Sequence, residues 1–522
     1  MATNNELSAL IKALPEFYQP IYGHDEWDAH SLRACTERLV AVEKIYDDLS
    51  RELKRPLRVL DLGCAQGFFS LSLAERGATV TGVDVVEQNI SLCKFLASEH
   101  PERKANFVCS KIEDFIPTVT SGKYDLVLCL SILHLVSKYL GVRKVQALTT
   151  DLSRKVPVGI FEFALEKVHA AYIPKDYRDF LSGYPFITEV IRVDHRKGSG
   201  VKRPICFASE KYAWLEKLGV LKTDKISYNV HPYLAKTDLI HFHCGDKFIK
   251  FFYVKNSTQL KLAHQEVQFL KEFYGQRGLP KLLATHAEQD ANGIRIFIAR
   301  EKLDGVVLSE KISSGEPIDR WDVLKQALQW MVFFEQHDYY HGDIQTPNFI
   351  YGADGKVYPI DYEEIRHEPI VMIWPYKVRL LFLIFMNAVL DLRPEQATFH
   401  REARLLTKLK RHLTQRQFEQ VSAIKDSEKF FARLYEILFE ADASDEPKAS
   451  CDLRELEILS QGKFLDDVSQ RLQELQNALV KTNADLAKFD GYISNITRML
   501  TAQQQRLEKL EKIVREMPND RT

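Results

Sequence analysis

Paired cysteines, a long apolar run and an excess of one charge are all missing from this sequence. Its eight cysteines never form a CxxC pair, which argues against a zinc site or a disulfide framework. The longest apolar run, 380–390, is far shorter than the roughly 20 residues that span a bilayer, and the N-terminus lacks a secretory signal. Lys and Arg number 71 against 72 Asp and Glu, so the summed charge does not favour nucleic acid. We therefore expect a cytoplasmic protein without a nucleic-acid partner.

Short β-branched runs alternate with helical stretches in the first third of the chain. The expected strands are 58–60, 79–83, 125–129 and 158–161. This rhythm is typical of a parallel, doubly wound sheet. The sequence therefore predicts an α/β fold for this part.

A tight turn with two glycines follows the first expected strand. Asp61, Gly63 and Gly67 form the pattern DxGxxxG, and such a turn lets the backbone approach a nucleotide-like ligand closely. Asp84 ends the next strand, where a carboxylate can accept hydrogen bonds from both hydroxyls of a ribose. Together they resemble class I (Rossmann-like) SAM-dependent methyltransferases rather than the GxGxxG dinucleotide fingerprint. A helix cap is the plain alternative for Asp84.

In that family the segment after the third strand contacts the adenine, which assigns Ile112 and Glu113 to this role. The methyl acceptor must be aligned with the donor. If the acceptor is a phosphate oxygen, it is already anionic and needs cations rather than a general base. The candidates for holding it are His134, Arg203 and His24, although lone polar residues of this kind are more often structural.

A second set of motifs indicates phosphoryl transfer. Asp343 precedes Asn348 in the segment HGDIQTPN, and Asp361 ends the hairpin that follows. We expect Asp343 to accept the proton of an attacking hydroxyl, and Asn348 and Asp361 to supply the hard oxygen ligands that Mg²⁺ prefers. The segment resembles the HxDxxxxN catalytic loop of protein-kinase-like enzymes, with Gly342 in place of the usual arginine and DYE in place of DFG.

Further kinase-like residues lie upstream of this loop. Lys250 lies in an apolar strand and Glu266 in the helical run after it, which fits a phosphate-holding lysine and its helix partner. The backbone of Glu301 and Leu303 falls where a kinase hinge passes the adenine of ATP. No GxGxxG precedes Lys250, so the phosphate-covering loop stays unassigned, with 231–238 as the only reasonable candidate. A pseudokinase or an unrelated fold is the alternative.

Apolar residues follow a heptad repeat near the end of the chain, beginning at Leu465. Sustained heptads favour self-association over a single helix packed on a neighbour, and Leu at most a positions favours a homotrimer. Composition breaks then predict five segments. They are a methyltransferase domain (1–210), a linker (211–235), a kinase-like α+β domain (236–440), a second linker (441–460) and a parallel coiled coil (461–517).

The domain order, together with LPEFYQ (14–19), DLGCAQGFFSLSLA (61–74) and EKL (301–303), resembles the WbdD-type kinase/methyltransferases that terminate bacterial O-antigen polymannose. The resemblance implies phosphorylation of the non-reducing terminal mannose of a lipid-linked glycan with ATP and Mg²⁺. Methylation of that phosphate with S-adenosyl-L-methionine would follow and end chain extension. It also places Tyr18 at the SAM site.

The same resemblance implies a coiled coil that spaces the cap, a glycosyltransferase polymerase as partner, and a peripheral location on the inner face of the inner membrane. Two alternatives stay open. One is a methyltransferase that acts directly on a sugar hydroxyl, with a regulatory kinase-like domain. The other is a coiled-coil scaffold whose catalytic domains are inactive.

Overall fold

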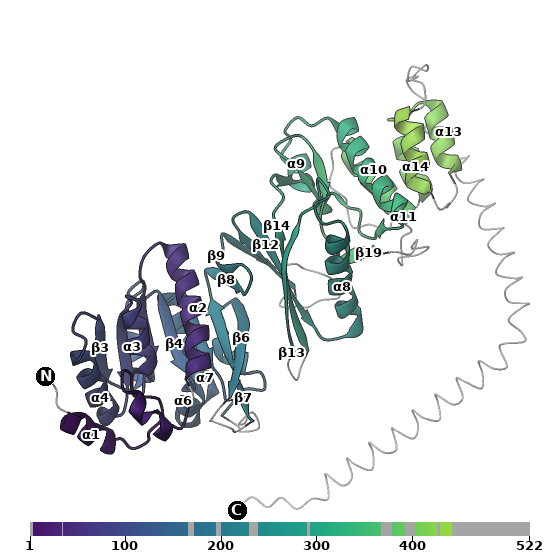
Figure 1. The fold of residues 1–522 in the computed structure, drawn as a ribbon. Helices are drawn as coiled ribbons and strands as arrows, with labels where there is room; N and C mark the ends of the chain where they lie inside the picture. Colours follow the sequence, from purple (N-terminus) through teal and green to yellow (C-terminus); the bar gives the residue numbers. More distant parts are fainter. Residues whose placement is uncertain are drawn as a thin grey trace, which may run out of the picture. The chain divides into compact units, whose positions relative to one another are not determined.

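The computed structural model (Figure 1) forms two compact units, Met1–Glu395 and Gln396–Thr522. The predicted coiled coil and the linker before it lie outside the described residues, so both stay predictions. The described residues are 4–33, 35–164, 172–194, 200–228, 239–289, 293–366, 378–391, 402–424 and 429–440.

The first unit begins with a seven-stranded sheet in the order β3-β2-β1-β4-β5-β7-β6. Its first five strands are parallel, and β7 and β6 extend it in antiparallel fashion. The predicted α/β sheet is confirmed, because all four expected strands are present. The strands are β1 (Arg58–Leu62), β2 (Thr79–Asp84), β3 (Ala105–Cys109), β4 (Leu126–Leu130), β5 (Val158–Glu162), β6 (Phe186–Asp194) and β7 (Lys202–Ser209).

Helices cover both faces of this sheet, so its central strands β4 and β5 are almost entirely buried. One buried cluster joins β1 and β4 to α2 and α3, and another joins the opposite face to α7. A third cluster packs α1 on α4. The helices are α1 (Asn4–Lys12), α2 (Thr36–Leu53), α3 (Phe68–Glu75), α4 (Glu87–Ser98), α5 (Ile112–Phe115), α6 (Leu133–Leu140) and α7 (Val142–Lys155).

A five-stranded antiparallel sheet follows, in the order β10-β11-β12-β14-β13. Phe242 and Phe297 on one of its faces contact Phe186 of β6, with ring centroids 5.1 and 5.4 Å apart. The two sheets therefore share one apolar core. Helix α8 (Ser257–Glu272) runs beside the second sheet (Figure 1). The strands are β10 (Lys225–Tyr228), β11 (Leu239–Cys244), β12 (Lys247–Val254), β13 (Leu282–Gln289) and β14 (Ile294–Glu301), preceded by the hairpin β8 (Tyr212–Leu215) and β9 (Gly219–Lys222).

The remainder of the first unit is mostly helical, as the apolar spacing around 322–337 and 375–392 predicts. Helix α10 (Arg320–Gln336) begins at Asp319, whose carboxylate accepts the N–H groups of Trp321 and Asp322. The other elements are α9 (Leu308–Ser313), α11 (Val378–Asp391), β15 (Val306–Val307), β16 (Tyr340–His341), β17 (Phe349–Tyr351), β18 (Val357–Pro359) and β19 (Ile365–Arg366).

The second unit contains short helices in its described part. Helix α13 (Gln415–Ala423) begins with a capping box between Thr414 and Gln417. Among the described residues of the whole chain, we find no helix whose length and apolar character would let it cross a membrane. The other helices of this unit are α12 (Glu402–Leu409), α14 (Phe430–Tyr435) and a π-helical turn (Glu436–Glu440).

Two candidate active sites

The predicted glycine turn joins β1 to α3. Gly63 and Gly67 have φ angles of +78° and +79°, a backbone region that favours glycine. A Cβ at Gly67 would lie 2.8 Å from Cys93 Sγ, so no other side chain fits there without movement. The N–H groups of Gly63 and Cys64 both donate to the carbonyl of Val83, which holds the turn against the end of β2.

Asp61 and Asp84 lie on either side of this turn. Asp61 is buried and accepts a hydrogen bond from Ser70 Oγ at 2.7 Å. Burial raises the pKa of Asp61 to about 7, the Ser70 hydroxyl opposes this and the charge of Asp84 adds to it. The Asp84 carboxylate accepts the N–H groups of Ala65 and Val86, both at 2.9 Å. Asp84 therefore fixes the turn, whether or not it also binds a ribose.

The predicted adenine residues lie along the same edge of the sheet. Strand β3 pairs with β2, and Ser110 donates its N–H to the carbonyl of Asp84 at 2.9 Å. Helix α5 begins there, with Ile112 buried and Glu113 half-buried. The glycine cradle, the strand-end carboxylate and this helix are thus brought together, and they fit an adenosine ligand such as S-adenosyl-L-methionine.

The N-terminal segment is bound to the glycine turn through side-chain amides. Gln66 Oε1 accepts the N–H of Gln19 at 2.9 Å, and Gln66 Nε2 donates to the carbonyl of Glu16 at 3.2 Å. Gln19 Oε1 in turn accepts the N–H of Phe68 at 3.2 Å. These bonds hold Tyr18, which lies between the two bonded residues, at the start of α3.

Three buried arginines meet at the carboxyl ends of β4 and β5. Arg203 Nη1 donates to Ser131 Oγ at 2.9 Å, and Arg33 Nη1 donates to the same oxygen at 3.3 Å. Glu162 pairs with Arg33 and Arg38, each at 3.2 Å. All three guanidinium groups belong to residues that are at most 2% exposed. We call this set of five residues the arginine cluster.

The arginine cluster adjoins the glycine turn. Ser131 precedes Ile132, whose side chain would lie 3.2 Å from a Cβ at Gly63. On the other side, the guanidinium carbon of Arg33 lies 4.9 Å from the centre of the Tyr18 ring. The segment that reaches the glycine turn therefore also reaches the arginines.

Three guanidinium groups and the carboxylate of Glu162 carry the charges of the five residues in the cluster. Burial alone would raise the pKa of Glu162, but Arg33 and Arg38 hold that pKa below its ordinary value. Burial raises the pKa of Tyr18, so its phenol stays protonated and can donate a hydrogen bond. The arrangement is suited to binding an anion.

The structure places the three predicted acceptor residues differently. Arg203 belongs to the arginine cluster, and His134 is buried on α6, three residues after Ser131. His24 instead contacts Glu26 and Glu99, with ring nitrogens 3.3 and 3.0 Å from their carboxylates. These contacts keep His24 out of the cluster, so nothing here supports an acceptor role for it. Sequence analysis missed Arg33, Arg38, Ser131 and Glu162, because four separate segments contribute to the cluster.

The predicted phosphotransfer residues meet around the loop between β16 and β17. Asn348 Nδ2 donates to Asp343 Oδ2 at 2.7 Å and to the Asp343 carbonyl at 2.9 Å, which leaves the amide oxygen of Asn348 for a metal. His341 Nδ1 accepts the N–H of Asp343 at 3.2 Å, so His341 Nε2 donates to the carbonyl of Ile360 at 3.1 Å. This histidine therefore holds the catalytic loop against the segment that carries Asp361.

Lys250 of β12 lies on the opposite side of this site. Its Nζ donates to Glu266 Oε2 at 3.1 Å and also hydrogen-bonds to Asp361. The two residues predicted as a pair are thus in contact. Burial alone would raise the pKa of Asp361, but Lys250 holds it to about 2. Asp361 is therefore ionised at neutral pH, as a ligand of Mg²⁺ must be. Burial raises the pKa of Asp343.

The expected hinge follows β14. Glu301 donates its N–H to the carbonyl of Lys281 at 2.9 Å, so an adenine contact from Glu301 would use its carbonyl. Leu303 is half-buried between β14 and β15. The segment suggested for covering the phosphates, 231–238, lies outside the described residues.

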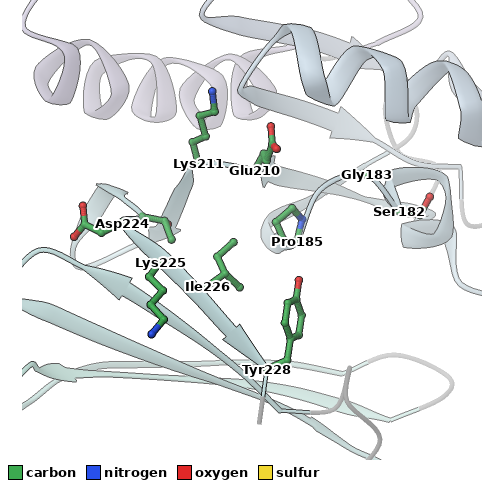
Figure 2. Close-up of a pocket in the computed structure, with 10 residues that line it drawn as sticks. Ser182, Gly183, Pro185, Glu210, Lys211, Asp224, Lys225, Ile226 and Tyr228 are labelled. Atoms are coloured by element: carbon green, nitrogen blue, oxygen red, sulfur yellow. The ribbon is translucent and has the colours of Figure 1, made fainter. Parts of the chain in front are cut away.

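A separate groove of about 500 Å³ lies beside β10 (Figure 2). Tyr228 and Ile226 extend toward Pro185 across it, whereas the charged ends of Lys211 and Lys225 point away. None of its lining residues belongs to either candidate site. They are Ser182, Gly183, Pro185, Glu210, Lys211, Thr223, Asp224, Lys225, Ile226 and Tyr228.

Comparison with known proteins finds relatives of the chain as a whole and of its first domain. A family model described as a methyltransferase domain matches residues 53–156. The chain is 32% identical over 400 residues to the O-antigen chain terminator bifunctional methyltransferase/kinase WbdD of Escherichia coli, an alignment that covers 73% of this chain and 55% of that protein. The chain thus spans about half the length of the curated relatives it matches. A ubiquinone biosynthesis O-methyltransferase of Rickettsia bellii is 28% identical over 223 residues, which cover 38% of this chain and 82% of that protein.

Solved structures of WbdD match over most of the chain. A high-resolution crystal structure has a TM-score of 0.64 at 28% identity and covers 88% of this chain and all of that one. A low-resolution structure with an ordered C-terminal bundle has a TM-score of 0.69 at 27% identity, and it covers 92% of this chain and all of that one. By sequence and fold, the chain is therefore a relative of the WbdD-type bifunctional methyltransferase/kinases.

Proposed function

We propose that this chain is a bifunctional enzyme that ends glycan extension in two steps. The kinase-like domain transfers a phosphoryl group from ATP to the non-reducing terminal mannose of a lipid-linked O-antigen glycan. The methyltransferase domain then transfers a methyl group from S-adenosyl-L-methionine to that phosphate. The capped end has no free hydroxyl at the phosphorylated position, and extension stops.

The arginine cluster is the observation that carries this proposal. A phosphate monoester has close to two negative charges at neutral pH, and guanidinium groups bind phosphate oxygens in pairs. Arg33 and Arg203 both reach Ser131, next to the turn that would hold the methyl donor. A phosphorylated sugar offers these guanidinium groups charged oxygens to bind, which an uncharged sugar hydroxyl does not.

Direct methylation of a hydroxyl would need a base to take its proton. The groups of the arginine cluster are poor bases: Tyr18 beside it stays protonated, and the low pKa of Glu162 reflects its ion pairs with two arginines. A phosphate oxygen is already anionic and needs only to be positioned. Methylation of the phosphate therefore suits these residues better.

The kinase-like site supplies the other half of the chemistry. Asp343 would accept the proton of the attacking sugar hydroxyl, and Lys250 would hold the phosphates. Asn348 and Asp361 would hold Mg²⁺, which neutralises charge on the transferred phosphoryl group. The glycine that replaces the usual arginine at Gly342 removes a partner for a phosphorylated activation loop, so we expect no control of that kind.

The acceptor, location and assembly rest on the relatives. WbdD of Escherichia coli is named as an O-antigen chain terminator, which supports a mannan-type glycan and, as partner, the glycosyltransferase polymerase that extends it. The predicted coiled coil would form a homotrimer and act as a spacer between the cap and the polymerase. Such a substrate would place the protein at the inner face of the inner membrane.

Mass spectrometry of a synthetic mannose oligosaccharide tests the two steps. With ATP and Mg²⁺ we expect the mass of one phosphoryl group to be added, and with SAM as well, one further methyl group. SAM without ATP should leave the oligosaccharide unchanged. Methylation of the unphosphorylated sugar by the Asp343→Ala variant at the wild-type rate would overturn the proposal.

The arginine cluster is tested separately with a phosphorylated acceptor. We expect Arg203→Gln to raise the KM for this acceptor at least tenfold, the order expected when a charged hydrogen bond is lost, while SAM affinity stays unchanged. Arg143→Gln, which removes an exposed arginine of α7, is the matched control. Equal KM values for the two variants would contradict the assigned acceptor site.

A further inference from the structure

The ammonium group of Lys250 contacts three carboxylates rather than one. Besides Glu266 and Asp361, Glu363 Oε2 lies 2.7 Å from Lys250 Nζ. Glu266 and Glu363 are 0% and 1% exposed, while the Asp361 side chain is 21% exposed toward the site. Two of the three partners are therefore sealed in the interior, and one faces the place where magnesium would bind.

The position of Glu363 is set by the core around it. Glu363 follows Tyr362 in a short 3₁₀ helix, Tyr362–Glu364. The Tyr362 ring is fully buried and stacks on Phe269 of α8, with centroids 5.0 Å apart. Because the strand β19 follows at Ile365 and pairs with β16, the backbone on both sides of Glu363 is fixed. Its carboxylate is held beside Lys250 by the fold.

A buried carboxylate here needs an explanation, because an ionised carboxylate is costly to bury without a partner. The resembling DFG tripeptide has glycine at this position, so the fold of the loop does not require a side chain there. The three carboxylates lie close enough together to hold a cation. The cation among them is the ammonium group of Lys250.

We propose that Glu363 is a positioning residue that keeps Lys250 in place when Asp361 turns to magnesium. The inference rests on the proposed kinase activity. While the site is empty, Asp361 shares Lys250 with the two buried glutamates. Once Asp361 binds a metal it no longer neutralises the ammonium group, and Glu266 and Glu363 remain as its two anchors.

If Lys250 has two anchors, each glutamate should partly replace the other. We expect Glu266→Gln and Glu363→Gln each to lower kcat for phosphoryl transfer by about tenfold. The double variant should lower kcat by clearly more than the product of the two single losses, since residues in one ion-pair network are not additive. Glu310→Gln, an exposed carboxylate of α9, is the matched control and should behave as wild type.

Nucleotide binding separates positioning from general damage. Calorimetry should show that Glu363→Gln binds Mg-ATP and metal-free ADP as tightly as the wild type, because Glu363 is sealed in the interior and acts only through Lys250. A variant that merely unfolds would lose binding and kcat together. Glu363→Gly, which restores the glycine of the related tripeptide, provides a second variant should the glutamine fail to fold.

Three results would overturn the inference. The first is that Glu363→Gln leaves kcat unchanged, both in the wild-type chain and in the chain that already carries Glu266→Gln. The second is a cycle in which the two effects simply multiply. The third is a raised Mg²⁺ requirement with unchanged ADP binding, which would make Glu363 a metal ligand instead. If the wild-type chain transfers no phosphate to mannose, the proposed function fails, and the calorimetric cycle still reports on Glu363.

Discussion

Replacement of Glu288 by alanine should strongly destabilise the junction between the two sheets of the first unit. Glu288 lies on β13 with a side chain only 2% exposed. It accepts hydrogen bonds from Thr188 Oγ1 at 2.7 Å and from the N–H of Glu189 at 2.6 Å, both on β6. It also pairs with Arg178 at 3.2 Å and Arg295 at 3.0 Å. One carboxylate thus satisfies four donors from three segments.

The magnitude follows from what stays behind. Arg178 keeps Asp176 at 3.5 Å, and Arg295 keeps the carbonyl of Ile187 at 2.8 Å, so neither guanidinium group is left without any partner. Breaking a buried ion pair by removing one side costs about 3–5 kcal/mol. We therefore expect a loss near the lower end, about 3 kcal/mol in the free energy of unfolding. The pKa of Glu288 is held at about 2 by His286 and the two arginines despite burial, so the effect should be constant across neutral pH.

Urea unfolding followed by tryptophan fluorescence measures this loss, since Trp214 lies in the apolar cluster shared by the two sheets. Glu216→Ala is the control: its carboxylate pairs with Lys44 at 3.1 Å but is 74% exposed, and such pairs contribute at most about 1 kcal/mol. We also expect the Glu288→Ala transition to separate into two steps. A loss below about 1 kcal/mol, or one equal to that of the control, would refute the argument.

Two predictions concern the glycine turn between β1 and α3. Gly67→Ala should lower SAM affinity more than tenfold, because the added Cβ would lie 2.8 Å from Cys93 Sγ. Gly77→Ala is the control, since Gly77 also has a positive φ but has nothing within 4 Å of its Cβ position, so this variant tests backbone strain alone. Equal SAM affinities of the two variants by calorimetry would contradict the prediction. Burial raises the pKa of Asp61 in the folded protein to about 7, above its pKa in the unfolded chain. The proton on Asp61 therefore stabilises the folded, unliganded protein at low pH, and this contribution is lost as pH rises toward 7. A cationic ligand prefers the ionised form, so SAM affinity should rise from pH 6 to pH 8, and a flat profile identical to that of Asp61→Asn would contradict the assignment.

Local patterns predicted the elements and motifs that short segments determine. The strands around Asp61 and Asp84 could be predicted because each is a continuous β-branched run, and a parallel sheet buries such runs on both faces. Lys250 and Glu266 could be paired because one strand and the following helix fix their separation. Asp343 and Asn348 lie in a single loop, so their spacing alone indicated their contact.

The arginine cluster had no comparable signal. Arg33 lies in a coil segment, Arg38 on a helix, and Glu162 and Arg203 at the ends of neighbouring antiparallel strands. Their convergence depends on how β7 returns beside β5, which no local spacing encodes. Glu363 was visible only as a departure from the kinase tripeptide. Its meaning required the knowledge that its carboxylate reaches Lys250.

The two candidate sites hold different charged groups, and this difference bears on the order of the proposed reactions. In the kinase-like site Lys250 contacts three acidic side chains, while the arginine cluster brings three guanidinium groups to Ser131 and Glu162. A terminal mannose is uncharged before the first reaction and offers these guanidinium groups no anion. Once phosphorylated, it carries the charged oxygens that guanidinium groups bind. The proposed order, phosphorylation first and methylation second, is the order in which the arginine cluster receives a phosphate.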